Sequence, residues 1–244
     1  MNLLPKGDKR LGEIEQALMS TGVVHGEFGF VEACALNHTC PSSKLPVFSK
    51  CDTNVIIKYF AYGSNMCSGR LRDRVPCEFV AIAKLARHQL RFHKLSKKDR
   101  SSKCDAFHTD VAADELWGVV YDITAAKKPA LDEFEGLGYG YEDVEVVVTL
   151  PTGEQLAART YVADPQFIRE GLAPYSWYKA YVQAGAVEHG LPLEYVAALI
   201  EAVTAEADPD QGRHDEETAK LHAWSAKDTK ISPLRQFILD SPTA

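Results

Sequence analysis

The fold of this chain is decided at residues 59–66, which read Tyr59-Phe60-Ala61-Tyr62-Gly63-Ser64-Asn65-Met66. The stretch follows the apolar run Val55-Ile56-Ile57 and precedes a polar segment that contains arginine. An apolar β-branched run that meets Gly-Ser-Asn is typical of a strand ending in a tight turn, with a helix starting at the Ser64/Asn65 cap. Gly63 lets a ligand approach the backbone, and the N–H groups of such a turn can bind an anion or oxyanion. The stretch therefore predicts a binding loop without naming its ligand.

The composition argues against several classes of protein. Of 244 residues, 45% are apolar and 25% are charged, which is ordinary for a globular protein with one sizeable core. The formal net charge of −7 at pH 7 argues against a general nucleic-acid-binding protein. No stretch approaches the roughly 20 apolar residues of a membrane span, and the N-terminus has no apolar signal core. We therefore expect a cytoplasmic protein without nucleic-acid or membrane partners.

The cysteines favour a reducing environment. There are six of them and no Cys-x-x-Cys pair: Cys34, Cys40, Cys51, Cys67, Cys77 and Cys104. Without a secretory signal, we expect reduced thiols instead of a disulfide framework. A metal site built from Cys34, His38, Cys40 and Cys51 would have irregular spacing, so we expect no metal.

The chain divides into three parts. Residues 1–54 form an extension with a predicted helix over Lys9–Ser20, and this extension either packs on the main domain or is a disordered arm. Residues 55–208 alternate between strand and helix patterns and form the main domain. Residues 209–244 are predicted to be a polar linker with a short amphipathic end. Strands are expected at Val55–Ala61, Phe79–Phe92 (bent), Glu115–Ile123, Asp143–Leu150 and Gln155–Val162. Helices are expected from Ala125 to Phe134 after a Thr124 cap, at Ser176–Glu188 and at Pro192–Ala205.

Three sequence segments, which follow one another along the chain, resemble those of a known family. They are residues 59–65, Leu131-Asp132-Glu133-Phe134-Glu135-Gly136, and Gly185-Ala186-x-x-x-Gly190-Leu191-Pro192-Leu193-Glu194-Tyr195. With them the chain resembles the γ-glutamylcyclotransferase family over roughly residues 57–208. The resemblance implies an α+β fold, a compact mixed β-barrel with surrounding helices and a cavity at one end. Residues 59–65 would line that cavity.

The resemblance also implies a reaction. The α-amino group of a γ-glutamyl amino acid or amine attacks its own γ-carbonyl, which releases 5-oxoproline and the free amine. Such an amide-cleaving acyltransferase or lyase of glutathione metabolism needs no cofactor. The enzyme must fold the substrate, and well-oriented intramolecular reactions reach effective molarities of ~10⁵–10⁸ M. It must also move protons and stabilise the oxyanion, and one buried carboxylate can move the protons as both base and acid.

The resemblance assigns that carboxylate to Glu135, and burial beside apolar groups such as Phe134 would suit it to the task. Glu133 lies two positions away on the same helix, so its side chain is expected to point elsewhere. The resemblance makes Tyr59, Phe60, Ala61, Tyr62, Gly63, Ser64, Asn65, Tyr141 and Tyr161 the substrate-binding residues. Ordinary strand or core packing is the alternative for the aromatic ones, and Tyr139 could replace Tyr141 because the preceding loop is one residue short.

Other interpretations stay open. One is a binding module without turnover, and another is a thiol hydrolase that uses Cys67 at a helix start. The leaving amine is not specified, although the glutathione-specific branch of such enzymes has Leu where this chain has Asn65. The segment Lys84–Lys103 is basic and Glu201–Glu217 is acidic. They are expected to be solvated surfaces that pair with each other or with a second subunit in a homodimer, or residues 96–103 form a flexible loop at the cavity mouth.

Overall fold

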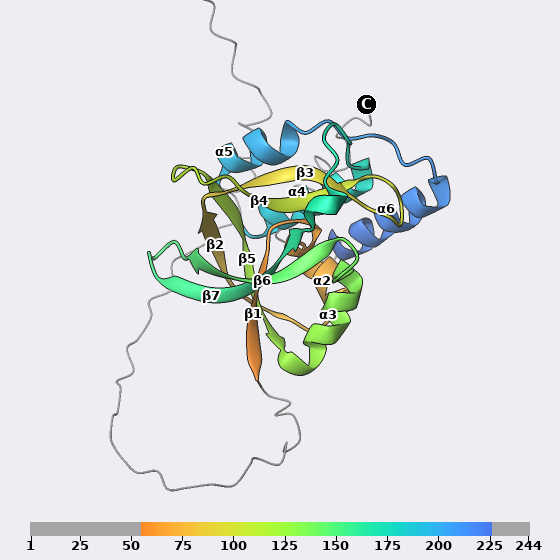
Figure 1. Ribbon diagram of the computed structural model, residues 1–244. Coiled ribbons are helices and arrows are strands. Elements are labelled where there is room, and N and C mark those ends of the chain that lie inside the picture. Colours follow the sequence, from red (N-terminus) through yellow and green to blue (C-terminus); the bar gives the residue numbers. More distant parts are fainter. Residues whose placement is uncertain (1–54, 226–244) are drawn as a thin grey trace, which may run out of the picture. The chain divides into compact units, whose positions relative to one another are not determined.

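The computed structural model describes residues 55–225, and a closed β-barrel forms its centre (Figure 1). The barrel strands are β1 (Ile56–Ala61), β2 (Glu78–Ala86), β5 (Glu115–Thr124), β6 (Tyr141–Thr149) and β7 (Gln155–Ala163). They follow the order β1-β5-β2-β6-β7. The ladders are antiparallel except that of β1 with β7, which runs parallel and closes the barrel. The predicted α+β fold with a mixed barrel is confirmed.

A separate two-stranded sheet contains β3 (His88–Leu95) and β4 (Ser102–His108). The prediction of one bent strand over Phe79–Phe92 is wrong because the chain turns at Arg87. This residue has a φ of 61°, and its N–H donates to the carbonyl of Asp114 at 2.7 Å. The turn therefore ends β2 and sends β3 into a different sheet. Strand β4, which the sequence did not predict, packs against β7.

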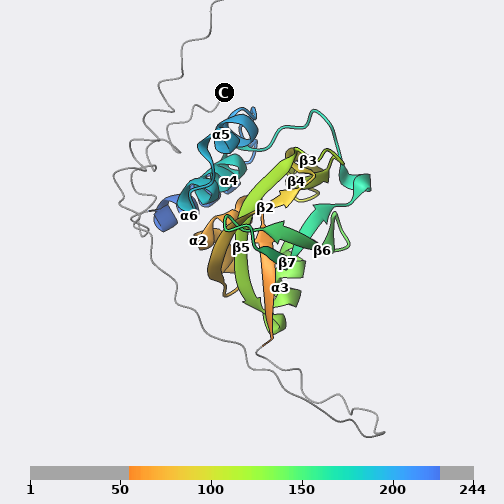
Figure 2. The ribbon, with the colours of Figure 1, turned by 90° about the vertical axis from the view of Figure 1, so that its left-hand side faces the viewer.

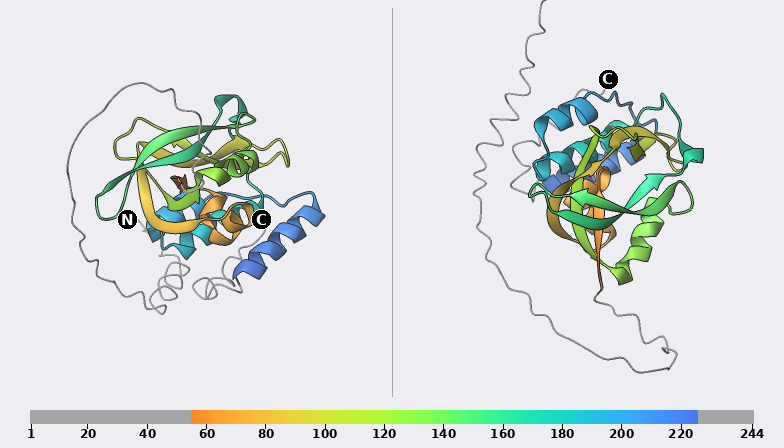
Figure 3. Two further views of the ribbon diagram at one scale, coloured as in Figure 1. Left: turned by 90° about the horizontal axis from the view of Figure 1, so that it is seen from below. Right: turned by 60° about the vertical axis from the view of Figure 1, so that its left-hand side comes forward.

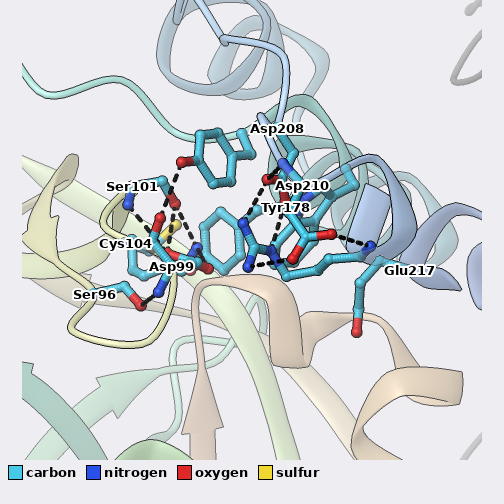
Figure 4. A network of polar contacts seen from close by, with 12 residues as sticks. Ser96, Asp99, Ser101, Cys104, Tyr178, Asp208, Asp210 and Glu217 are labelled. Atoms are coloured by element: carbon cyan, nitrogen blue, oxygen red, sulfur yellow. Dashed lines mark hydrogen bonds and ion pairs between the residues drawn. The ribbon is translucent and has the colours of Figure 1, made fainter. Parts of the chain in front are cut away.

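The turn between β3 and β4 is tied down by polar contacts. The Ser96 N–H donates to the Ser101 carbonyl at 2.9 Å, and the Lys103 ammonium pairs with the Asp99 carboxylate at 2.7 Å. From outside the hairpin, the Tyr175 hydroxyl donates to the Asp99 carbonyl at 2.9 Å. Figure 4 shows Ser96, Asp99 and Ser101 in a network of polar contacts that also includes Tyr178 and Glu217. The turn is therefore held in place by hydrogen bonds within the hairpin and from Tyr175.

The helical segments are η1 (Ser64–Met66), α2 (Ser68–Arg74), η2 (Ala125–Lys127), α3 (Lys128–Glu135), η3 (Pro165–Phe167), α4 (Ser176–Glu188), α5 (Leu193–Val196), the π-helical η4 (Ala197–Glu201) and α6 (Gln211–Ser225). The bounds of α4 match the prediction. The expected helix after Thr124 begins as η2, and Thr124 makes no side-chain cap. Gly136, in the left-handed conformation with a φ of 71°, ends α3 as predicted. Figures 2 and 3 show α4, α5 and α6 gathered on one side of the barrel, with α3 apart from them.

Helix α6 was not expected, because residues beyond 208 had been assigned to a polar linker. It is anchored by polar contacts. The carboxylate of Glu217 pairs with Arg70 at 2.8 Å, and its carbonyl accepts from the Tyr181 hydroxyl at 3.0 Å. Just before the helix, Asp208 accepts from the indole N–H of Trp177 at 2.8 Å. These contacts attach α6 to α2 and α4.

The two oppositely charged segments do not pair with each other. Within residues 55–225, no ion pair joins residues 84–103 to residues 201–217. Lys84 instead pairs with Glu115 at 2.5 Å, and Glu217 pairs with Arg70. The expectation that the two segments pair is therefore not met within the described chain, and pairing with a second subunit stays a prediction.

Helix α4 fixes the segment that follows β1 through a glycine. A Cβ at Gly185 would lie 2.3 Å from the Cys67 nitrogen and 2.4 Å from the Met66 carbonyl carbon. Only a residue without a side chain permits this approach, which explains the glycine in the third of the three sequence segments. The Met66 side chain is fully buried in the same contact region. The packing of α4 therefore sets the position of η1.

Residues 1–54 and 226–244 lie outside the described residues, and with them the predicted helix Lys9–Ser20 and the cysteine–histidine set considered for a metal. Within the described part, no helix is both long and apolar enough to cross a membrane. Across residues 55–225, no group of three His, Cys, Asp or Glu side chains is arranged to hold a metal ion.

Candidate active site

A cavity of about 300 Å³, its open mouth included, lies where β1 runs into η1. Its wall is drawn from β1, η1, β4, α3, β6, β7 and α4, and it consists of Tyr59, Tyr62, Gly63, Ser64, Asn65, Cys104, Glu135, Tyr141, Tyr161 and Tyr178. The structure thus brings the predicted catalytic residue together with most of the predicted binding residues. Two of the predicted set are not in the wall. Phe60 and Ala61 are 0% and 1% exposed and belong to the core.

Glu135 is the only carboxylate in the wall of this cavity. It is the last residue of α3, and the left-handed Gly136 turns the chain away directly after it. Its side chain is 15% exposed. Glu133, the rival carboxylate, is exposed and lies outside the wall, as its position on the helix predicted.

The two oxygens of the Glu135 carboxylate have different surroundings. Oε1 accepts from Asn65 Nδ2 at 2.7 Å and from an Arg74 guanidinium N–H at 2.7 Å. The same guanidinium nitrogen donates to Asn65 Oδ1 at 2.8 Å, so the three side chains form a closed triangle. Oε2 has no hydrogen-bond partner among residues 55–225. One oxygen is anchored, and the other is free to accept a proton.

Arg74 is a site residue that sequence reasoning missed. It is the last residue of α2, and its side chain reaches back to the start of the turn after β1. The guanidinium also lies over the ring of Phe134, 5.6 Å from its centroid. Phe134 is 49% exposed, so the expectation that it buries Glu135 in an apolar environment is wrong. The carboxylate is held by a cation and an amide instead.

The hydroxyls of three cavity tyrosines donate to fixed acceptors. Tyr141 donates to the Cys104 carbonyl at 2.6 Å, Tyr161 donates to Asp132 Oδ1 at 2.6 Å, and Tyr62 donates to the Tyr161 carbonyl. Burial raises the pKa of each of these hydroxyls above the usual value of tyrosine, so all three stay neutral. These tyrosines therefore supply a rigid, uncharged wall.

Tyr139 and Tyr141 were alternatives for one position, and the structure separates them. Tyr141 is 7% exposed and lines the cavity, whereas Tyr139 is 75% exposed and does not. Two further wall residues, Cys104 and Tyr178, were not predicted. They meet where the Cys104 N–H donates to the Tyr178 hydroxyl at 3.0 Å. No local motif marks either of them, because β4 and α4 come together only in the folded chain.

The turn after β1 presents backbone donors to the cavity. The Met66 N–H donates to the Gly63 carbonyl at 2.9 Å, which starts η1 as a 3₁₀ turn. Within the described residues, the N–H groups of Gly63 and Ser64 donate to no protein acceptor. A Cβ at Gly63 would lie 3.0 Å from the Cys104 Cβ, so the glycine permits close packing beside these donors. Gly63 and Ser64 line the cavity, their role as a donor cradle stays a prediction, and the α-helix proper begins later, at Ser68.

The geometry argues against the thiol hydrolase. Cys67 is fully buried and is not part of the cavity wall. Burial raises the pKa of its thiol to about 12, so it is not a thiolate near neutral pH. Burial is the dominant cause, and it outweighs the backbone N–H groups of Arg70 and Gly69 at the helix start, which lower the pKa of Cys67. The expectation that the helix start activates this thiol is therefore wrong.

Known proteins resemble this chain in sequence and in structure. A model of the AIG2-like family matches residues 115–199. The gamma-glutamylcyclotransferases of Bos taurus and Homo sapiens are each 34% identical to it over 149 residues, which is 58% of this chain and 76% of each relative. A solved structure titled gamma-glutamyl cyclotransferase has 29% identity and a TM-score of 0.59, and covers 68% of this chain and 99% of its own. The crystal structure of an uncharacterized Homo sapiens protein has 30% identity and a TM-score of 0.58, and covers 67% of this chain and 98% of its own. With the carboxylate and the donor turn meeting in one cavity, the chain belongs to the γ-glutamylcyclotransferase family.

Proposed function

We propose that this protein is a γ-glutamylcyclotransferase that converts γ-glutamyl amino acids or γ-glutamyl amines into 5-oxoproline and the free amine. Membership of the family supports the reaction class. The observation that carries the proposal is the state of Glu135. Its Oε1 is anchored by Asn65 and Arg74, and its Oε2 is unpartnered among the described residues in a cavity that also holds free backbone donors.

The reaction balances without a covalent enzyme intermediate. The α-amino nitrogen of the substrate attacks the γ-carbonyl carbon, so a C–N bond forms and closes a five-membered ring. The γ-amide C–N bond then breaks and the amine leaves. In total, two protons move from the α-nitrogen to the leaving nitrogen, and Glu135 Oε2 accepts and returns them. The carboxylate therefore ends in its starting form.

The protein contributes position and charge stabilisation. The N–H groups of Gly63 and Ser64 are proposed to bind the oxyanion that forms on the γ-carbonyl oxygen, a role that such donors fill best in a site closed to water. Tyr59, Tyr141 and Tyr161 are proposed to hold the folded glutamyl chain. General acid–base transfer by a positioned carboxylate contributes about 10²–10⁴-fold. Folding the substrate so that its nitrogen meets its carbonyl supplies the rest.

The test is product formation. Chelator-treated protein is incubated with a panel of γ-glutamyl amino acids and amines, and 5-oxoproline is followed by chromatography. We expect 5-oxoproline from at least one member of the panel, and an equal yield from the Cys67→Ala variant. Tight binding of panel members without any product would favour the binding module. Loss of activity in Cys67→Ala, with an unchanged melting temperature, would favour the thiol hydrolase.

The cellular location and the oligomeric state are proposed on fewer observations. We propose a cytoplasmic location, which is supported by the free, buried thiols of Cys67, Cys77 and Cys104. A homodimer and the absence of a nucleic-acid partner stay predictions from the sequence.

A further inference from the structure

Lys94 is a buried cation beside the cavity. It lies near the end of β3 and is 7% exposed. Its ammonium is 4.3 Å from the centroid of the Tyr141 ring, and Tyr141 is part of the cavity wall. It also lies against the backbone at Gly140, where a Cβ would be 2.9 Å from Nζ. Lys94 therefore packs on the outer edge of the wall, close to the loop that follows Glu135.

Lys94 differs from Lys128, the other buried lysine of the described chain, and from the half-buried Lys103 in having no anionic partner among residues 55–225. Lys103 pairs with Asp99, and Lys128 pairs with Asp132 and Asp143. Among residues 55–225, no carboxylate lies within ion-pair distance of the Lys94 ammonium, and the ammonium makes no hydrogen bond. A side chain that is largely shielded from water and has no anionic partner there would be stabilised by an arriving anion.

The charges around Lys94 explain its protonation. Burial lowers the pKa of Lys94 to about 8, and the charges of Lys103 and Lys98 act in the same direction. The charges of Glu135 and Asp99 oppose this decrease in pKa. Near neutral pH the side chain is thus charged, and it lies close enough to the catalytic carboxylate for the two to interact. One guanidinium nitrogen of Arg74, the cation in contact with Glu135, donates to both Glu135 and Asn65.

We propose that the Lys94 ammonium binds a carboxylate of the γ-glutamyl substrate at the edge of the Tyr141 ring. This inference rests on the proposed function and deepens it. The flexible four-carbon stem of lysine allows the ammonium to turn from the ring toward the cavity mouth. The substrate can present two different carboxylates to Lys94. One is the α-carboxylate of the glutamyl unit, which every substrate has, and the other is the carboxylate of a leaving amino acid, which γ-glutamyl amines lack.

The experiment compares γ-glutamylalanine with γ-glutamylalanine amide, which differ only in the leaving-group carboxylate. The variants are Lys94→Met, which keeps the apolar stem, and Lys94→Arg, which keeps the charge. Lys97→Met is the matched control, because Lys97 lies on the same hairpin but is exposed. We expect Lys94→Met to raise KM about tenfold or more, as the loss of one charged hydrogen bond predicts, while Lys97→Met leaves KM unchanged.

The pattern of loss identifies the carboxylate. A rise in KM for γ-glutamylalanine alone assigns the leaving-group carboxylate, and a rise for both substrates that Lys94→Arg reverses assigns the glutamyl carboxylate. Unchanged KM values overturn the proposal, and so does a loss confined to kcat that Lys94→Arg does not restore. If Lys94→Met is unstable, Lys94→Gln takes its place.

A failure of the proposed function is distinguishable from a failure of this inference. Wild-type protein that makes no 5-oxoproline from either substrate refutes the function. Binding of γ-glutamylalanine is then measured by calorimetry. Affinity about tenfold weaker in Lys94→Met than in Lys97→Met still supports the carboxylate contact, and equal affinity overturns it.

Discussion

Replacing Arg74 by Met should lower kcat by about ten- to a hundredfold with little change in KM. The substitution keeps a long apolar stem but removes the hydrogen bonds of 2.7 Å to Glu135 and 2.8 Å to Asn65. Oε1 of Glu135 then keeps only its bond to Asn65, and the carboxylate can rotate away from the substrate. A shift of about 1 Å in a catalytic group can cost about a hundredfold in rate.

The stability change follows from the exposure of the pair. The side chains of Arg74 and Glu135 are 18% and 15% exposed, between a surface and a buried ion pair. Removing one partner should therefore decrease the free energy of unfolding by about 1–3 kcal/mol. Urea denaturation measures this decrease, and steady-state release of 5-oxoproline measures kcat and KM. Arg72→Met is the control, because Arg72 lies on the same helix and is exposed.

A specific result would refute this reasoning. If Arg74→Met keeps kcat within about twofold of wild type, Arg74 does not position Glu135, because loss of even one charged hydrogen bond predicts more. If kcat falls equally in Arg72→Met, the loss of activity results from removing any positive charge from α2 and not from the contact with Glu135. Arg74→Lys should have a kcat between those of Arg74→Met and wild type, since lysine keeps the charge but lacks the planar guanidinium whose one nitrogen donates to both partners.

Further predictions concern the base, the lysine and the core. Glu135→Gln should lower kcat by about 10²–10⁴-fold, with a decrease in the free energy of unfolding no larger than that of Arg74→Met, while Glu133→Gln stays near wild type; the reverse order of losses in kcat would move the catalytic role to Glu133. If Lys94 binds the leaving-group carboxylate, the preference for γ-glutamylalanine over its amide should decrease as pH rises through about 8, because Lys94 loses its charge there, and it should persist at higher pH in Lys94→Arg. The two substrates share the same α-amino group, so its titration largely cancels in their ratio. Gly185→Ala should decrease the free energy of unfolding by about 1–3 kcal/mol in urea denaturation through overpacking, whereas Gly212→Ala should not. Equal stability of these two variants would show that α4 can shift away from η1.

The meeting of the turn after β1 with Glu135 in one cavity was predictable because the family resemblance marks both segments. Residues 59–65 combine a strand end with a glycine turn, and Glu135 directly precedes the helix-ending Gly136. The closed barrel agrees with the resemblance that these segments carry. Tyr141 is in the wall as the resemblance implied, although its binding role stays a prediction.

The missed features depend on contacts between distant segments. Strand β4 begins with polar residues, and its half-buried Lys103 pairs with Asp99. Helix α6 has little apolar periodicity, and its attachment depends on partners such as Arg70. Arg74 looked like an ordinary charge at a helix end. A sequence pattern separates apolar from polar residues, so it cannot identify a polar side chain whose partner lies far along the chain.

The bond between Asn65 and Glu135 has a mechanical consequence. Asn65 belongs to the same turn as the backbone donors of Gly63 and Ser64, and its amide is tied to Oε1 of the carboxylate at 2.7 Å. In the proposed mechanism, this hydrogen bond couples the position of the proton acceptor to that of the proposed oxyanion donors. A displacement of α3 would therefore be resisted by the turn after β1.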